Sequence, residues 1–101
     1  MAIDVEIQDE LGGTIARYDG PRFDQKLLKL APAHGPCFRF IVPWDNTTFN
    51  REQIPVLMGE LRDAQSRTDN VERLRELEAL LNFLQRATDP ARHMYVKFMG
   101  D

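Results

Sequence analysis

Few residues in this chain have side chains that could do covalent or metal chemistry. The single cysteine, Cys37, lies three residues after His34, and an imidazole beside a thiol can take its proton and make it a nucleophile. No third residue is placed to orient that imidazole, so the sequence favours Cys37 as a small, inert hydrophobic residue. The other histidine, His93, has no histidine or cysteine nearby at metal-ligand spacing. We therefore predict no catalytic residues, no metal site and no cofactor.

Sequence motifs that mark common active sites are absent as well. The chain has no glycine-rich dinucleotide or P-loop motif, no G-x-S-x-G nucleophile elbow, no H-E-x-x-H zinc motif and no C-x-x-C pair. The sequence thus favours a non-enzymatic protein, and an enzyme remains an alternative only if its site is assembled from distant residues.

The most unusual local segment runs from Pro43 to Asn50 and contains the only tryptophan. An aromatic residue among polar neighbours on a loop is typical of an anchor for a binding partner. The predicted partner-binding residues are those of this segment together with two from neighbouring strands: Trp44, Asp45, Asn46, Thr48, Arg39 and Tyr95. The alternative is that Trp44 and Phe49 fold inward as a lid on the core, because Asp45 to Thr48 are also favoured turn and cap residues.

Length and composition bound the class of protein. The chain has 101 residues, of which 43% are hydrophobic and 29% charged, so we expect a single globular domain covering residues 1–101. The formal net charge of -3 argues against nucleic acid as a partner, because binding to phosphate needs clustered Lys and Arg. A lone cysteine, an N-terminus without signal-peptide features and the lack of a long apolar run predict a cytoplasmic protein without membrane contact.

The elements that must position these residues follow from the spacing of apolar side chains. Residues 3–8 alternate apolar and polar types, which predicts a strand, and residues 14–18 predict the second strand of a hairpin across Gly12 and Gly13. Apolar residues from Phe23 to Leu30 recur at helical spacing and indicate a short helix. The segment CFRFIV, residues 37–42, is rich in β-formers and predicts a central strand with Phe38, Phe40 and Val42 on one face.

Two further helices and a final strand complete the predicted order. Pro55 is tolerated only in a first turn, so one helix should begin near Gln53 or Ile54 after a cap at Asn50 or a neighbour, and residues 64–70 should form a polar joint. The pattern Asp69-x-x-Glu72 resembles a capping box for a helix that includes Val71 in its apolar stripe and ends around residue 88. Residues 93–99 alternate again and predict the last strand.

The resulting order, ββαβααβ, predicts an α+β fold with an antiparallel sheet and helices packed on one face. The other face would then carry the polar residues of the strands: Asp4, Glu6, Arg17, Arg39, Tyr95 and Lys97. Such a face is either a solvated ladder of cross-strand ion pairs or a docking surface for a partner.

One resemblance rests on two segments of the chain. PWDNTTFNREQIPVLMGEL and the ending HMYVKFMGD resemble small bacterial proteins of unknown function that share a D-x-T-x-F-N loop before an Ile-Pro helix and a final F-x-G-D. The likeness covers the chain from Arg39 onward and implies no activity and no functional residues. Small acidic proteins of this kind are also similar in general character to toxin-neutralising immunity proteins.

Three functional hypotheses follow. The first is a module that binds another protein, as an immunity protein or a regulatory inhibitor. The second is a small enzyme or ligand-binding protein with a pocket built from Arg39, Asp45, His93 and Tyr95. The third is a homodimer that uses an uncovered edge or face of the sheet.

Overall fold

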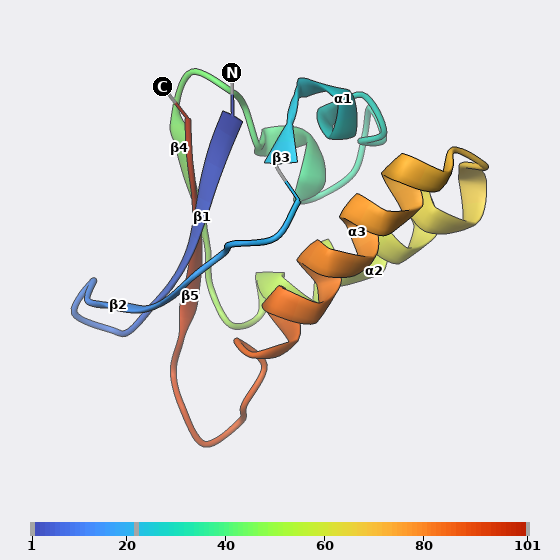
Figure 1. Ribbon diagram of the computed structural model, residues 1–101. Helices are drawn as coiled ribbons and strands as arrows, with labels where there is room; N and C mark the ends of the chain where they lie inside the picture. Colours follow the sequence, from blue (N-terminus) through green and yellow to red (C-terminus); the bar gives the residue numbers. More distant parts are fainter. Residues whose placement is uncertain (1, 22, 101) are drawn as a thin grey trace.

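The protein folds as an antiparallel sheet with its helices on one side, as the computed structural model shows (Figure 1). The structure describes residues 2–21 and 23–100. The main strands lie in the order β2-β1-β5-β4 and are β1 (Ala2–Gln8), β2 (Thr14–Arg17), β4 (Asn46–Phe49) and β5 (Tyr95–Met99). A two-residue strand, β3 (Phe23–Asp24), pairs with the start of β1. The predicted α+β class is confirmed.

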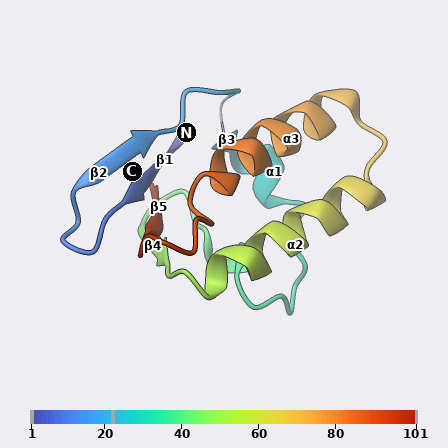
Figure 2. The same cartoon turned by 90° about the horizontal axis from the view of Figure 1, so that it is seen from below.

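The helical segments all lie on the same side of this sheet (Figure 1). They are α1 (Gln25–Leu28), the 3-10 helix η1 (Phe38–Phe40), α2 (Gln53–Arg67) and α3 (Val71–Gln85). The two long helices, α2 and α3, run side by side as a helical hairpin whose closed end projects away from the sheet (Figure 2). No described helix covers the opposite face of the sheet.

The two central strands form because their side chains alternate between the core and solvent. Val5 stands opposite Phe98 and Ile7 opposite Val96, and all four side chains are buried. The ring centroid of Phe98 lies 5.5 Å from that of Phe23 and 5.8 Å from that of Phe49, so one residue of β5 joins β3 and β4 to the core. The predicted strands at residues 3–8 and 93–99 and the predicted hairpin are confirmed, with β5 beginning at Tyr95.

Helix α2 begins at Gln53, as predicted. Asn50 Oδ1 accepts hydrogen bonds from the backbone N–H groups of Glu52 (2.9 Å) and Gln53 (3.0 Å), and Gln53 Oε1 accepts from Asn50 N–H (3.0 Å). These reciprocal bonds satisfy backbone donors that have no partner inside the helix. Pro55 falls in the first turn, where its missing N–H is tolerated.

The prediction of a central strand over residues 37–42 is wrong. Phe38–Phe40 forms η1, and Phe38 is fully buried whereas Phe40 is 48% exposed, so these side chains do not share a face. The cause lies far away in sequence. Glu60 of α2 accepts hydrogen bonds at Oε1 from the backbone N–H groups of Cys37 (2.8 Å) and Phe38 (3.1 Å), which turns the chain into a helical bend.

The polar segment predicted as a loop instead supplies the missing strand. Asn46–Phe49 forms β4, in which Asn46 pairs with Met99 and Phe49 with Val96. Threonine is a favoured strand residue, and β5 offers a free edge at this position. The strand count predicted from the sequence is therefore retained in the main sheet, but β4 lies at an edge rather than in the centre.

Four smaller expectations also change. The helix expected from Phe23 to Leu30 is reduced to the four residues of α1 after β3, and α2 continues to Arg67 through part of the expected joint. The cap of α3 is Asn70, whose Oδ1 accepts from Arg73 N–H (3.1 Å), and Asp69 is not the cap. Val71 is 67% exposed, so it does not belong to the apolar stripe of α3.

The outer face of the sheet carries a polar row across the strands. Glu6 stands opposite Arg17 on one side and Lys97 on the other, and its Oε2 lies 3.1 Å from Arg17 Nε. Its Oε1 accepts hydrogen bonds from Gln8 Nε2 (3.1 Å) and Thr14 Oγ1 (3.0 Å). These neighbours leave Glu6 only 9% exposed, and the contact between Glu6 and Arg17 is one cross-strand ion pair of the kind predicted for this face. Of the residues predicted for this face, Arg39 is misplaced, because it lies in η1.

Glu6 makes the stability of the fold sensitive to acid. The hydrogen bond from Gln8, with that from Thr14 and the charges of Arg17 and Lys97, lowers the pKa of Glu6 below its ordinary value of 4.5. A lowered folded-state pKa gives stability that is complete above the ordinary pKa and is lost as pH falls through the folded-state value. The free energy of unfolding of the wild type should therefore fall as the pH drops below 4.5. In urea titrations at a series of pH values, we expect this fall to be smaller by about 0.5–1 kcal/mol in Glu6→Gln, which has no carboxylate to protonate.

Asp4→Asn is the matched control for this prediction. Asp4 is an exposed carboxylate on the same face of β1 and makes no hydrogen bond or ion pair to a described residue. Its replacement should leave the pH profile near that of the wild type. Equal acid sensitivity in the wild type and Glu6→Gln would show that the Glu6 cluster does not contribute.

Candidate functional site

The most exposed aromatic side chain lies in the connection between η1 and β4. Trp44 is 69% exposed, whereas Phe49 at the end of β4 is 3% exposed. The alternative in which both aromatic residues form a lid on the core therefore holds for Phe49 and not for Trp44. A large indole left in solvent is uncommon without a partner to cover it.

The backbone around Trp44 is held by contacts with the end of β5. Gly100 N–H donates to the carbonyl of Asp45 (3.0 Å), and Asp45 Oδ1 accepts from Asn46 N–H (2.7 Å). A Cβ at position 100 would lie 2.7 Å from backbone atoms of Pro43 and Asp45. The backbone on either side of Trp44 therefore packs closely against Gly100. Thr47 Oγ1 also donates to the carbonyl of Phe40 (2.9 Å). The indole thus projects from a fixed backbone.

A hollow of about 430 Å³ adjoins the indole. One wall comes from α1 and the turn after it, and the other from the connection that carries Trp44. We call this hollow with its walls the Trp44 surface, and its residues are Gln25, Leu28, Lys29, Ile41, Val42, Pro43 and Trp44. Five of the seven are apolar, which is the composition of a binding site with few polar contacts.

Lys29 is the one charged residue among these lining residues. Its ammonium group makes no hydrogen bond or ion pair to any residue that the structure describes. It is exposed and has three donors available for an acceptor brought by a ligand or partner. Among the described lining residues, no Asp, Glu, His or Cys side chain stands beside it, so the arrangement offers apolar contacts and one cation for binding.

The free edge of β4 extends this region. Because Gly100 N–H donates to Asp45 C=O, the alternation of an antiparallel pair directs the carbonyl of Asn46 and the N–H and C=O of Thr48 away from β5. The edge has no charged residue or proline within Asn46–Phe49 to discourage pairing. A partner at the Trp44 surface would find backbone donors and acceptors close by along the chain.

The structure brings some of the predicted partner-binding residues together and separates others. Four of them are exposed and lie within five positions of the chain: Trp44, Asp45, Asn46 and Thr48. Arg39 is exposed in η1, where its Nε donates to Gly35 C=O (2.7 Å) and its guanidinium lies 4.2 Å from the ring centroid of Phe40.

The pocket proposed from Arg39, Asp45, His93 and Tyr95 does not form. Asp45 stands beside Gly100 at one end of β5, and Tyr95 is five residues earlier, about 16 Å along a strand. His93 stacks on Tyr95 with ring centroids 5.0 Å apart, at the end of the sheet remote from Asp45.

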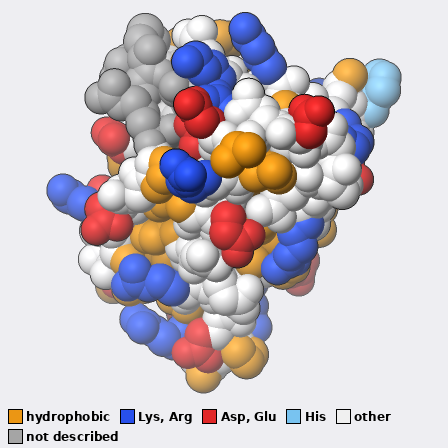
Figure 3. All heavy atoms as spheres, turned by 45° about the vertical axis from the view of Figure 1, so that its right-hand side comes forward, with side chains coloured by type: hydrophobic (Ala, Val, Ile, Leu, Met, Phe, Trp, Pro, Cys, Tyr) orange, Lys and Arg blue, Asp and Glu red, His pale blue; other side chains and the backbone are white. Residues whose placement is uncertain are grey.

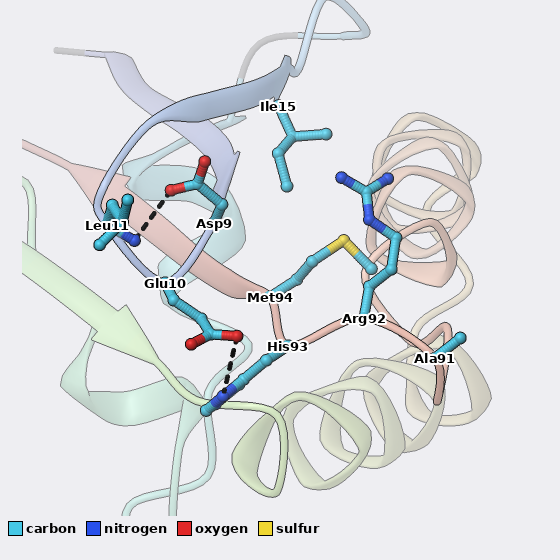
Figure 4. A pocket seen from close by; sticks show the side chains of 8 residues that line it. All are labelled: Asp9, Glu10, Leu11, Ile15, Ala91, Arg92, His93 and Met94. Atoms are coloured by element: carbon cyan, nitrogen blue, oxygen red, sulfur yellow. Dashed lines mark hydrogen bonds and ion pairs between the residues drawn. The ribbon is translucent and has the colours of Figure 1, made fainter.

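A second hollow, of about 480 Å³, lies at that remote end (Figure 4). It is lined by Asp9, Glu10, Leu11, Ile15, Ala91, Arg92, His93 and Met94. Met94 lies between the acidic side chains of the β1–β2 hairpin and Arg92, and His93 Nδ1 lies 3.9 Å from Glu10 Oε1. Asp9 Oδ1 accepts from Leu11 and Gly13 N–H and so shapes the turn (2.9 and 2.8 Å). We regard the Trp44 surface as the better candidate because opposite charges and turn bonds already occupy this second hollow.

Cys37 has the environment of a structural residue. Its side chain is 2% exposed, its Sγ lies 3.8 Å from the carbonyl of Gln53, and burial together with the charge of Glu60 raises its pKa. A raised pKa reduces the thiolate fraction that a nucleophile needs. Among the described residues, no group of three His, Cys, Asp or Glu side chains could hold a metal ion.

The side of the molecule that carries the helical hairpin does not suggest a site. Lys and Arg side chains are interspersed with Asp and Glu over this side, and the hydrophobic side chains form small groups between them (Figure 3). Arg73 Nε, for example, lies 2.8 Å from Glu76 Oε1 on α3. No field of a single sign marks this side for a charged partner.

The residues that complete the Trp44 surface could not be predicted from the sequence. Gln25, Leu28 and Lys29 belong to a segment whose helical spacing suggested only core packing, and Ile41 and Val42 were assigned to a strand. Nothing local signals that these two segments meet, because they are brought together only by the fold of the chain.

The fold and the site together define a small α+β protein with one apolar surface beside an exposed tryptophan. Comparison of the chain with protein-family models, with curated proteins and with solved structures found no match. Within residues 2–21 and 23–100, no helix has the length and apolar character needed to cross a bilayer.

Proposed function

We propose that this protein is a non-enzymatic module that binds another protein through the Trp44 surface. The observation that carries the proposal is the 69% exposed indole of Trp44 at the wall of an apolar hollow. Tryptophan is enriched among the few residues that supply most of the binding energy at protein interfaces. The free edge of β4 offers backbone hydrogen bonds next to this anchor.

The more specific version of the proposal is a cytoplasmic immunity protein or regulatory inhibitor of bacterial type. Such a protein acts by occlusion: it covers a functional site on its partner and needs no chemistry of its own. The small size of the chain and a rigid surface around one aromatic anchor support this role, because a preorganised surface loses little entropy on binding.

Affinity capture from a lysate of the source organism tests the proposal with two matched variants. Trp44→Ala removes the anchor, and Val71→Ala removes a hydrophobic side chain of similar exposure, 67%, at the start of α3. We expect a stoichiometric partner with the wild type and Val71→Ala, and a loss of affinity of about thirtyfold or more with Trp44→Ala. Both variants should remain folded by circular dichroism, because both side chains are mostly in solvent.

Two results would contradict the proposal. One is a partner that binds Trp44→Ala as tightly as the wild type. The other is the absence of a partner together with a molecular mass that rises with concentration, which would favour the homodimer instead.

A further inference from the structure

The chemistry of the Trp44 surface points to the kind of segment that it accepts. We infer that the partner inserts an apolar side chain with a carboxylate next to it, so that the apolar group fills the hollow and the carboxylate meets Lys29. The inference rests on the proposed function and names the partner's contact chemistry.

The charge of the hollow favours an acidic contact. Among the described residues that line the hollow, Lys29 alone is charged, and its ammonium has no partner in the part of the chain that the structure describes. A carboxylate brought to Lys29 beside apolar walls would form a charge-assisted hydrogen bond in a partly water-excluded place, where such bonds are stronger.

The apolar walls of the hollow favour an apolar side chain as the occupant. Leu28, Ile41 and Val42 line the hollow with Pro43 and Trp44, and Gln25 is the one uncharged polar residue among the described lining residues. An aliphatic or aromatic side chain would remove these apolar walls from water, which is favourable. A polar or doubly charged occupant would not gain this hydrophobic stabilisation. The occupant is therefore apolar at its centre and acidic at its margin.

The exposure of Trp44 favours a protein segment over a small molecule. A drug-sized ligand is usually enclosed over most of its surface. Here one wall is an indole that is 69% exposed, so the hollow can cover only one side of its occupant. A side chain that projects from a larger partner fits this shape, because the partner itself covers the other side and the remaining indole surface.

The test is selection of a displayed random heptapeptide library on the immobilised full-length protein, with Trp44→Ala as the counter-selection. We expect the enriched peptides to contain an aliphatic or aromatic residue adjacent to Asp or Glu. The most enriched peptide is then synthesised, and its affinity is measured with the wild type, Lys29→Glu and Arg62→Glu. Arg62 is an exposed cation of α2 outside the hollow and serves as the matched control.

Lys29→Glu should weaken binding of that peptide by about tenfold or more, and Arg62→Glu should change it by less than about twofold. Three outcomes would overturn the inference: no enrichment over Trp44→Ala, an enriched consensus without acidic residues, or equal effects of the two charge reversals. If the lysate partner depends on Trp44 but not on Lys29, the proposed function stands and only the acidic contact is refuted.

A second copy of the chain is the remaining rival occupant. Leu11 at the tip of the β1–β2 hairpin is 97% exposed and follows Asp9 and Glu10, so it has the required chemistry. A concentration-dependent mass that is lost in both Leu11→Ser and Lys29→Glu would assign the hollow to this self-contact and would overturn the inference of a different partner.

Discussion

Replacement of Glu60 with alanine is expected to lower the free energy of unfolding by about 2–6 kcal/mol. Glu60 Oε1 accepts hydrogen bonds from the backbone N–H groups of Cys37 (2.8 Å) and Phe38 (3.1 Å), and both of these residues are buried. Without the carboxylate, two buried amide donors lose their acceptor, and each such loss costs about 1–3 kcal/mol. Urea denaturation followed by circular dichroism measures the change.

Two variants separate this cause from a general effect on α2. Glu60→Gln keeps an oxygen acceptor, so its loss should be smaller than that of Glu60→Ala. Arg62→Ala changes an exposed residue of the same helix and should stay within about 0.5 kcal/mol of the wild type. If Glu60→Ala costs no more than Arg62→Ala, the two bonds to η1 contribute nothing to stability.

The thiol of Cys37 supplies a second measurement of the same contact. Its side chain is 2% exposed and its raised pKa keeps it protonated, so it should react slowly with a disulfide reagent. Loss of the Glu60 bonds frees the backbone at Cys37 and removes a nearby negative charge. We therefore expect Glu60→Ala to react faster than the wild type, and an unchanged rate would contradict the proposed role of Glu60 in fixing η1.

Gly100→Ala is expected to destabilise the protein by about 1–3 kcal/mol. The added Cβ would lie 2.7 Å from the carbonyl oxygen of Asp45 and from the carbonyl carbon and oxygen of Pro43. These are backbone atoms, which cannot rotate aside as a flexible side chain can, so the connection that carries Trp44 must move. Thermal and urea unfolding measure the loss.

Gly59→Ala is the matched control for this prediction. Gly59 lies inside α2, and a Cβ there meets no atom within 4 Å, so alanine should raise stability by about 0.5–1 kcal/mol. The indole N–H resonance of Trp44 should shift in Gly100→Ala and stay in place in Gly59→Ala. A Gly100→Ala variant with wild-type stability and an unshifted indole resonance would show that the close approach is not needed.

The elements whose signals are local could be predicted from the residues alone. Strands β1 and β5 follow from strict alternation, as in Val5 and Ile7 opposite Phe98 and Val96, because one face of each strand must be buried. Helix α2 follows from the cap at Asn50 and the limit set by Pro55. Together with the hairpin and α3, these signals were enough to predict the α+β class and the antiparallel sheet.

Part of the candidate site was also visible in the sequence. Trp44 with its polar neighbours was identified from composition alone, and the structure places its indole in solvent. The same composition could not separate Trp44 from Phe49, because which aromatic side chain of an exposed segment turns inward depends on the register of β4 against β5. That register buries Phe49 opposite Val96.

The path from Cys37 to Phe49 depends on contacts between distant parts of the chain. CFRFIV has strand-forming residues, but the carboxylate of Glu60, more than twenty positions later, binds two of its amides and bends it into η1. NTTF has no apolar alternation, yet the open edge of β5 makes it a strand. The Trp44 surface exists because the fold places Leu28 and Lys29 around the same hollow as Ile41 and Val42. Long-range hydrogen bonds and packing outweigh local preference here, since propensities of a few tenths of a kcal/mol per residue are smaller than the contribution of a hydrogen bond to a charged group.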